Sequence, residues 1–123
     1  MAQSAGLHEP ADSLDEATID HHRAIVSLQE ELEAVDWYDQ RVNATRDRSL
    51  ADILAHNRDE EKEHASMVLE WLRRHDAVLD QHLRTYLFTA EPVTEVEAEA
   101  VAAEAGDGAG DGSLGIGSLK GVD

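Results

Sequence analysis

The chain of 123 residues contains no cysteine, only two prolines and few aromatic side chains, which make up 4% of it. Without cysteine, neither a disulfide framework nor a thiolate metal site can stabilise the fold. Any metal must therefore be bound by carboxylates and imidazoles. The chain has 27 acidic residues and 7 histidines to supply them.

Long apolar runs and basic clusters are also missing. No segment approaches the ~20 consecutive apolar residues of a membrane helix, and the N-terminal residues lack a signal-peptide pattern. With 10 Lys and Arg and a net charge of −17, the chain is a poor match to nucleic acid, whose phosphates need clustered basic residues. We expect a soluble cytoplasmic protein with neither nucleic acid nor a membrane as partner. Cations fit the charge better, although a negative surface is also typical of ordinary solubility.

Glycine is absent from residues 12–90, whereas seven of the eight glycines lie between residues 106 and 121. This division predicts a flexible N-terminus (1–12), a helical domain (13–90), a flexible acidic and glycine-rich linker (91–112) and a separate C-terminal peptide (113–123).

The first predicted helix begins at the Ser13-x-x-Glu16 pattern, which has the form of a capping box, and ends near Asn43. Apolar residues recur along it at the three and four residue steps of one helical face. They are Ala24, Leu28, Val35, Tyr38 and Val42.

A turn is predicted at residues 43–49, with Asp47 or Ser49 capping a second helix that ends near His75. A third, shorter helix is expected over residues 78–88. The stripe of the second helix consists of Leu50, Leu54, Asn57, Val68 and Trp71.

Polar residues interrupt both stripes: Glu31 in the first helix, and Glu61 and His64 in the second. The Glu-x-x-His spacing places a carboxylate and an imidazole on one helical face, and an unpaired buried carboxylate is costly. If the hairpin turns near residues 46–47, Glu31 lies about 15 residues before the turn and the pair about 15 to 17 after it. All three residues should therefore lie at the same position along the hairpin.

Two interpretations suit these three residues. A buried salt-bridged or hydrogen-bonded cluster would specify register in a coiled-coil dimer. A metal site accounts better for the excess negative charge, because di-iron carboxylate sites take a Glu from each of two helices and a Glu-x-x-His from each of two others. One chain supplies half of that set. We therefore expect an all-α fold, an antiparallel two-helix hairpin plus a short third helix, which dimerises into a ferritin-like four-helix bundle around two metal ions.

Other polar and aromatic residues flank this cluster. Glu30 and Glu33 can form an acidic path for Fe(II) or an ordinary solvated face, as can Asp59, Glu60 and Glu63. Trp37 suits core packing, and the Tyr38 hydroxyl can hydrogen-bond a ligand carboxylate. Among the remaining histidines, His56 is the best candidate for an accessory metal.

At the C-terminus, Leu114, Ile116 and Leu119 are separated by glycine and serine. Such a peptide suits docking in extended form into a groove of another protein, or is a frayed end.

Several segments resemble encapsulated ferritin, the ferritin-like cargo of encapsulin nanocompartments. The likeness covers most of residues 13–90 and, separately, the last ten or so. Its motifs are Glu30-Glu-Leu-Glu-Ala-Val-Asp-Trp-Tyr-Asp-Gln40, His56-Asn-Arg-Asp-Glu-Glu-Lys-Glu-His64, Trp71-Leu-Arg-Arg74 and the terminal Gly-Ser-Leu-Gly-Ile-Gly.

The resemblance implies dimers with a ferroxidase centre at their interface, an annular decamer of five dimers, and an encapsulin shell that stores the mineral and binds the C-terminal peptide. It implies two iron ions per dimer interface, with Ca or another divalent ion able to bind where metal enters. By motif match, the iron ligands are Glu31, Glu61 and His64, the site through which metal enters is Glu30, Glu33 and Trp37, and Tyr38 supports catalysis.

The expected function is thus oxidation of Fe(II) to Fe(III) inside an encapsulin nanocompartment. Two alternatives use the same residues: a non-catalytic acidic helical adaptor that buffers metal ions, and a peroxide-reducing di-iron enzyme.

Overall fold

The computed structural model describes residues 6–108, with side chains through residue 105, and this part of the chain is all-α. It divides into two compact units, one ending at Leu72 and the other beginning at Arg73. After a short 3-10 turn, η2 (Ala11–Ser13), the α-helices are α1 (Glu16–Ala44), α2 (Arg48–Arg74), α3 (Ala77–Tyr86) and α4 (Val93–Gly108).

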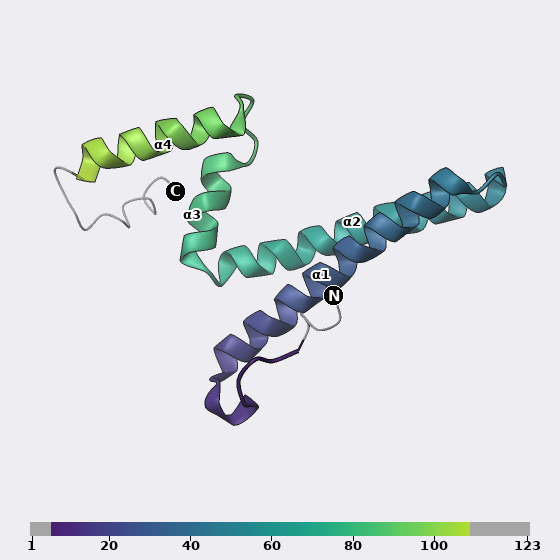
Figure 1. Cartoon of the computed structure of the whole chain (residues 1–123), viewed down its shortest axis with the longest axis horizontal. Helices are drawn as coiled ribbons and strands as arrows, with labels where there is room; N and C mark the ends of the chain where they lie inside the picture. The colour runs from purple at the N-terminus through teal and green to yellow at the C-terminus, as the bar shows by residue number, and fades with distance from the viewer. Residues whose placement is uncertain (1–5, 109–123) are drawn as a thin grey trace. The chain divides into compact units, whose positions relative to one another are not determined.

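Helices α1 and α2 form the long hairpin of the first unit, joined by the turn at the right of Figure 1. The prediction of two long helices with a short turn between them is confirmed. Their length follows from the absence of glycine and proline between residues 12 and 90, since these are the residues that end or weaken helices.

The start of α1 differs from the sequence prediction. Asp15, rather than Ser13, is the N-cap, and its carboxylate accepts a 2.8 Å hydrogen bond from the Thr18 amide, which lowers the pKa of Asp15. Ser13 lies in η2 instead. A carboxylate caps as well as a hydroxyl and also interacts favourably with the positive end of the helix dipole, so Asp15 takes the position.

The start of α2 matches one of the two predicted caps. Asp47 Oδ1 accepts a 2.9 Å hydrogen bond from the Leu50 amide. The Asp47 amide in turn donates to the Thr45 hydroxyl at 3.2 Å. The turn thus pairs the Leu50 amide, which the start of α2 leaves without a partner in the helix, and one amide of its own.

Few side chains of the hairpin are buried. Helix α1 has no buried residue, and α2 has two, Ala65 and Leu72. Large apolar side chains of both helices are exposed instead: Ile25, Leu32 and Trp37 on α1, and Leu50, Ile53 and Met67 on α2. Apart from Leu50, these residues lie outside the predicted apolar stripes, whose other members are half-buried, so a single chain leaves additional apolar side chains uncovered.

In the second unit, α3 begins at the predicted place but ends two residues early. Asp76 caps it by accepting a 2.9 Å hydrogen bond from the Leu79 amide. The backbone is already extended at Leu87, and Phe88 has a φ of 63°, in the left-handed region that a helix cannot continue through.

Asp80 is the buried charged residue of this unit, and it lies between two arginines. Arg73 donates to Asp80 Oδ1, and Arg84 Nε donates to both carboxylate oxygens at 3.0 and 3.2 Å. Burial opposes ionisation of Asp80, but these hydrogen bonds outweigh it and hold its pKa below the ordinary value. The cluster ties the end of α2 to α3 within the unit.

Helix α4 corrects the expectation of a flexible linker over residues 91–112. The segment is rich in alanine and glutamate, which are strong helix formers, and their propensity outweighs the shortage of apolar residues. Helix α4 packs on α3, and its Val96 is buried. Residues 109–112 and the predicted docking peptide at 113–123 lie outside the described residues.

Within residues 6–108, none of the helices is long and apolar enough to cross a membrane.

Candidate metal centre

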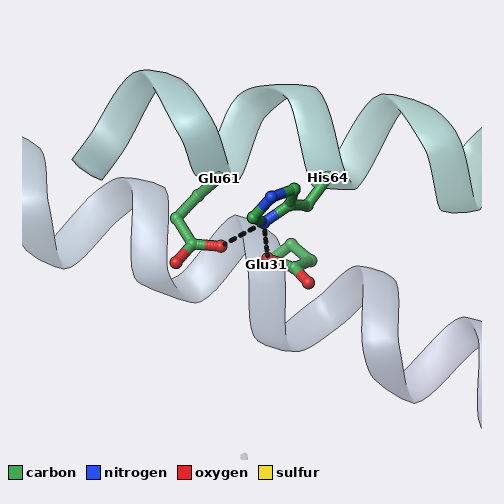
Figure 2. A group of neighbouring side chains, drawn as sticks. All are labelled: Glu31, Glu61 and His64. Carbon is green, nitrogen blue, oxygen red and sulfur yellow. Dashed lines mark hydrogen bonds and ion pairs between the residues drawn. The ribbon is translucent and has the colours of Figure 1, made fainter. Parts of the chain in front are cut away.

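Three side chains from the two long helices converge at the middle of the hairpin. Figure 2 shows Glu31 on α1 facing Glu61 and His64 on α2. The three-residue spacing of Glu61 and His64 puts both on the side of α2 that faces α1. The structure therefore brings together the three residues that interrupt the apolar stripes.

The distances within this cluster are short. Nδ1 of His64 lies 3.3 Å from Glu61 Oε1 and 3.7 Å from Glu31 Oε1. One ligand atom from each of the three residues lies within 4.8 Å of the other two, which is the arrangement that one cation between them requires.

The cluster is only partly shielded within one chain. The side chains of Glu31 and Glu61 are each 25% exposed and that of His64 is 46% exposed. The imidazole thus has a free side, from which a further ligand or a second metal ion can approach.

The electrostatics of the three groups are linked. The hydrogen bond with Glu61 is the main cause that raises the pKa of Glu31, followed by burial and the negative charges of Glu61 and Glu30. The same bond, together with His64, lowers the pKa of Glu61. The hydrogen bond to Glu61 and the carboxylates of Glu31 and Glu60 raise the pKa of His64. Protonation of Glu31 and of His64 is therefore favoured relative to the isolated groups.

The donor set fits iron. Two carboxylates are hard oxygen donors, which suit Fe(III) as well as Fe(II), and imidazole is a common ligand of iron. Three protein ligands also leave coordination positions open for a bridging group or a substrate. The residues in one chain would therefore hold one iron ion incompletely.

The flanking acidic residues are less closely involved. Oε1 of Glu60 lies 4.0 Å from His64 Nε2, and the other carboxylate oxygen of Glu60 lies 3.7 Å from His56 Nε2. Glu30 is exposed and Glu33 half-buried. Neither of these two belongs to the group of ligand atoms that converge within the described residues.

The two aromatic residues of α1, Trp37 and Tyr38, differ in exposure within a single chain. Trp37 is 48% exposed, which does not match the predicted core packing within one chain. Tyr38 is half-buried and contacts Arg41, whose guanidinium carbon lies 5.4 Å from the ring centroid. Among the described residues, no hydrogen bond joins its hydroxyl to a carboxylate of the cluster.

Sequence reasoning missed a second contact across the hairpin. Arg58 Nη1 on α2 donates to Asp39 Oδ1 on α1 at 2.9 Å. The register that places Glu31 opposite Glu61 and His64 also places residue 39 opposite residue 58. Counting residues from the turn for the charged side chains would therefore have found this pair.

An all-α hairpin with two glutamates and a Glu-x-x-His histidine at its centre matches one half of the ferritin-like bundles that bind metal through carboxylates. A sequence model of the EncFtn-like family matches residues 6–90. The chain therefore belongs to the EncFtn-like family, the encapsulated ferritin-like proteins.

Two curated relatives and one solved structure are also similar to this chain. An encapsulated ferritin-like protein of Rhodospirillum rubrum is 64% identical, covering 98% of this chain and 93% of the relative. A ferritin-like protein of Thermotoga maritima is 52% identical, covering 91% of this chain and 96% of the relative. The crystal structure of a protein from Nitrosomonas europaea superposes with a TM-score of 0.70 at 61% identity, covering 72% of this chain and 97% of that one.

Proposed function

We propose that two copies of this chain form a ferroxidase centre that oxidises Fe(II) to Fe(III). The observation that carries the proposal is the convergence of Glu31, Glu61 and His64, with ligand atoms within 4.8 Å, in a chain of the EncFtn-like family. The same geometry suits other divalent cations, and the carboxylate-rich donor set favours iron because hard oxygen donors stabilise the ferric product.

The centre is completed by a second chain. One hairpin supplies one glutamate and one Glu-x-x-His, which is half of a four-helix di-iron set. It also exposes Leu32 and Ile53, which an isologous partner would cover. Five such dimers joined in a ring are the assembly that the resemblance to encapsulated ferritin implies.

Iron is the substrate of the reaction. Two Fe(II) ions held between the two chains give up one electron each, and molecular oxygen takes both with two protons to form hydrogen peroxide. Because the electrons leave as a pair, no one-electron oxygen radical is released. Glu31 and Glu61 neutralise the positive charge that oxidation adds to the iron ions. His64 binds iron through a ring nitrogen that must first lose its proton.

Residues around the centre have supporting roles in this proposal. Iron or another divalent ion such as Ca enters past Glu30, Glu33 and Trp37. The Tyr38 hydroxyl hydrogen-bonds a ligand carboxylate once the second chain is in place.

The oxidised iron is delivered inside an encapsulin shell. The relative from Rhodospirillum rubrum is an encapsulated protein by name, and residues 113–123 of this chain form a glycine-rich peptide with spaced apolar side chains. We assign this peptide to docking on the shell, the 13–90 region to the ferritin-like domain, and the compartment interior in the cytoplasm as the location.

The test is aerobic oxidation of Fe(II), followed by the ferric absorbance, in Glu31→Ala, Glu61→Ala, His64→Ala and a matched Asp52→Ala control. Asp52 is an exposed carboxylate of α2 outside the cluster. Each ligand variant should lose oxidation, and the control should keep it. Equal rates in all four variants would favour an acidic adaptor, whose ion binding depends on bulk charge. A strong preference for peroxide over oxygen as oxidant would favour a peroxide-reducing enzyme.

A further inference from the structure

The ion pair between Asp39 and Arg58 crosses the hairpin. Arg58 uses two of its donors: Nη1 bonds Asp39 on α1 at 2.9 Å, and Nε bonds Asp59 on α2 at 3.1 Å. Its side chain is 22% exposed, and the hydrogen bonds with Asp59 and Asp39 raise its pKa. The guanidinium is therefore held in one orientation, from which it reaches across to α1.

This pair lies next to the metal centre, on the side of the turn. Asp39 follows Glu31 by eight residues on α1, a rise of ~12 Å along the helix, and Arg58 precedes Glu61 by three residues on α2, a rise of ~4.5 Å. On the opposite side of the centre, the rings of His21 and Trp71 meet edge to face with centroids 5.6 Å apart. The centre is thus bracketed by two contacts between α1 and α2.

Register between the helices matters more to a metal site than to an apolar seam. A screw displacement of α1 by one residue moves Glu31 by ~1.5 Å along the helix axis and rotates it by about 100° around that axis. Ligand atoms must hold their positions to within about 0.2 Å. Ala65 and Leu72 are the buried apolar residues of the hairpin, so side-chain packing within the chain constrains the slide weakly. A directional contact beside the centre supplies the missing constraint.

We propose that Asp39 and Arg58 are positioning residues that set the register of α1 on α2 and thereby hold Glu31 opposite Glu61 and His64. The inference rests on the proposed function of the cluster as a metal centre. Neither residue is a ligand. Their effect reaches the metal through the placement of Glu31 relative to the two ligands of α2.

The experiment compares Asp39→Asn, Arg58→Gln and the double variant with the wild-type chain. The probe is Co(II) alone, titrated under anaerobic conditions and followed by its ligand-field absorbance, which reports both affinity and coordination geometry. Glu31→Ala marks complete loss of the site. The matched control is Arg23→Gln, which removes an exposed ion pair of 2.8 Å to Asp20 that lies within α1 and does not cross the hairpin.

Each single variant should weaken Co(II) binding about tenfold and alter the absorbance band, as loss of an outer contact does in other metal sites. The double variant should bind Co(II) about as tightly as the single variant with the lower affinity, because both substitutions break the same contact. Arg58→Lys should recover part of the affinity, since the ammonium keeps the positive charge but lacks the planar guanidinium fork that fixes the bonds to Asp39 and Asp59. The control and the apo-state helicity should match the wild type.

Unchanged Co(II) affinity and spectrum in both single variants, with loss in Glu31→Ala, would overturn the positioning role and leave the ferroxidase proposal intact. Loss of helicity in the apo variants would overturn it too, because the pair would then act on folding. If the wild-type protein binds Co(II) and the Asp39 and Arg58 variants bind it more weakly, while neither the wild type nor any variant oxidises Fe(II), the positioning role stands and the ferroxidase proposal fails.

Discussion

Oε1 of Glu31 on α1 lies 3.7 Å from Nδ1 of His64 on α2, although the two residues belong to different helices joined by a turn. Neither helix alone contains all three candidate ligands. The contact exists because α1 and α2 run antiparallel with their centres level, and it places an α1 carboxylate against the Glu-x-x-His pair of α2.

The first prediction concerns assembly. Under anaerobic conditions, Fe(II) should raise the solution mass to at least twice that of one chain, because each chain carries half of the proposed ligand set. A chelator should reverse the part of this increase in mass that depends on metal. Light scattering after size exclusion measures it. His64→Ala should lose the response to metal. A chain that binds iron in full stoichiometry and stays a monomer would contradict the shared centre.

The second prediction concerns pH. The pKa values of Glu31 and His64 are raised, so these groups hold protons at higher pH than usual, and a metal ion must displace them. Metal affinity should therefore fall as pH is lowered through the range above 6.5, where His64 gains its proton, and fall further as Glu31 becomes protonated above 4.5. Calorimetry in buffers of different ionisation enthalpy should show proton release on binding of Zn(II). An affinity that does not change with pH would contradict it.

The third prediction concerns Asp80. Its pKa is held below 3.8 in the folded chain, so its contribution to stability is fully present above that pH and is lost as pH falls through the folded value. Asp80→Asn should lower the midpoint of thermal unfolding by a few degrees at pH 7, and the difference from wild type should shrink below about pH 3.8. Circular dichroism measures the unfolding midpoints of Asp80→Asn and of the wild type at each pH. Asp52→Asn, an exposed carboxylate, serves as the control and should leave them unchanged.

The fourth prediction concerns the C-terminal peptide. Truncation after Gly112 should leave Fe(II) oxidation at the wild-type level, because the ligands lie on α1 and α2. It should abolish co-purification with a co-expressed encapsulin shell protein. Retained loading of the shell by the truncated chain would show that the peptide is not the docking signal.

Local sequence patterns predicted the helices well where one physical signal dominated. The long runs without glycine and proline, the apolar periodicity and Asp47 together placed α1, the turn and α2 within a few residues. The patterns failed where two signals competed. Ser13 and Asp15 both suit an N-cap, and the alanine and glutamate of residues 93–108 suit both an acidic linker and a helix.

The donor set of the candidate centre could be predicted from the sequence alone. The absence of cysteine leaves oxygen and imidazole donors, and Glu31, Glu61 and His64 stand where apolar residues should be. Only the tertiary structure decided that their ligand atoms meet within 4.8 Å, and that Asp39 and Arg58 close a contact beside them. The reason is that periodicity specifies which face of a helix a residue occupies, whereas the slide of one helix on another depends on contacts between residues far apart in the chain.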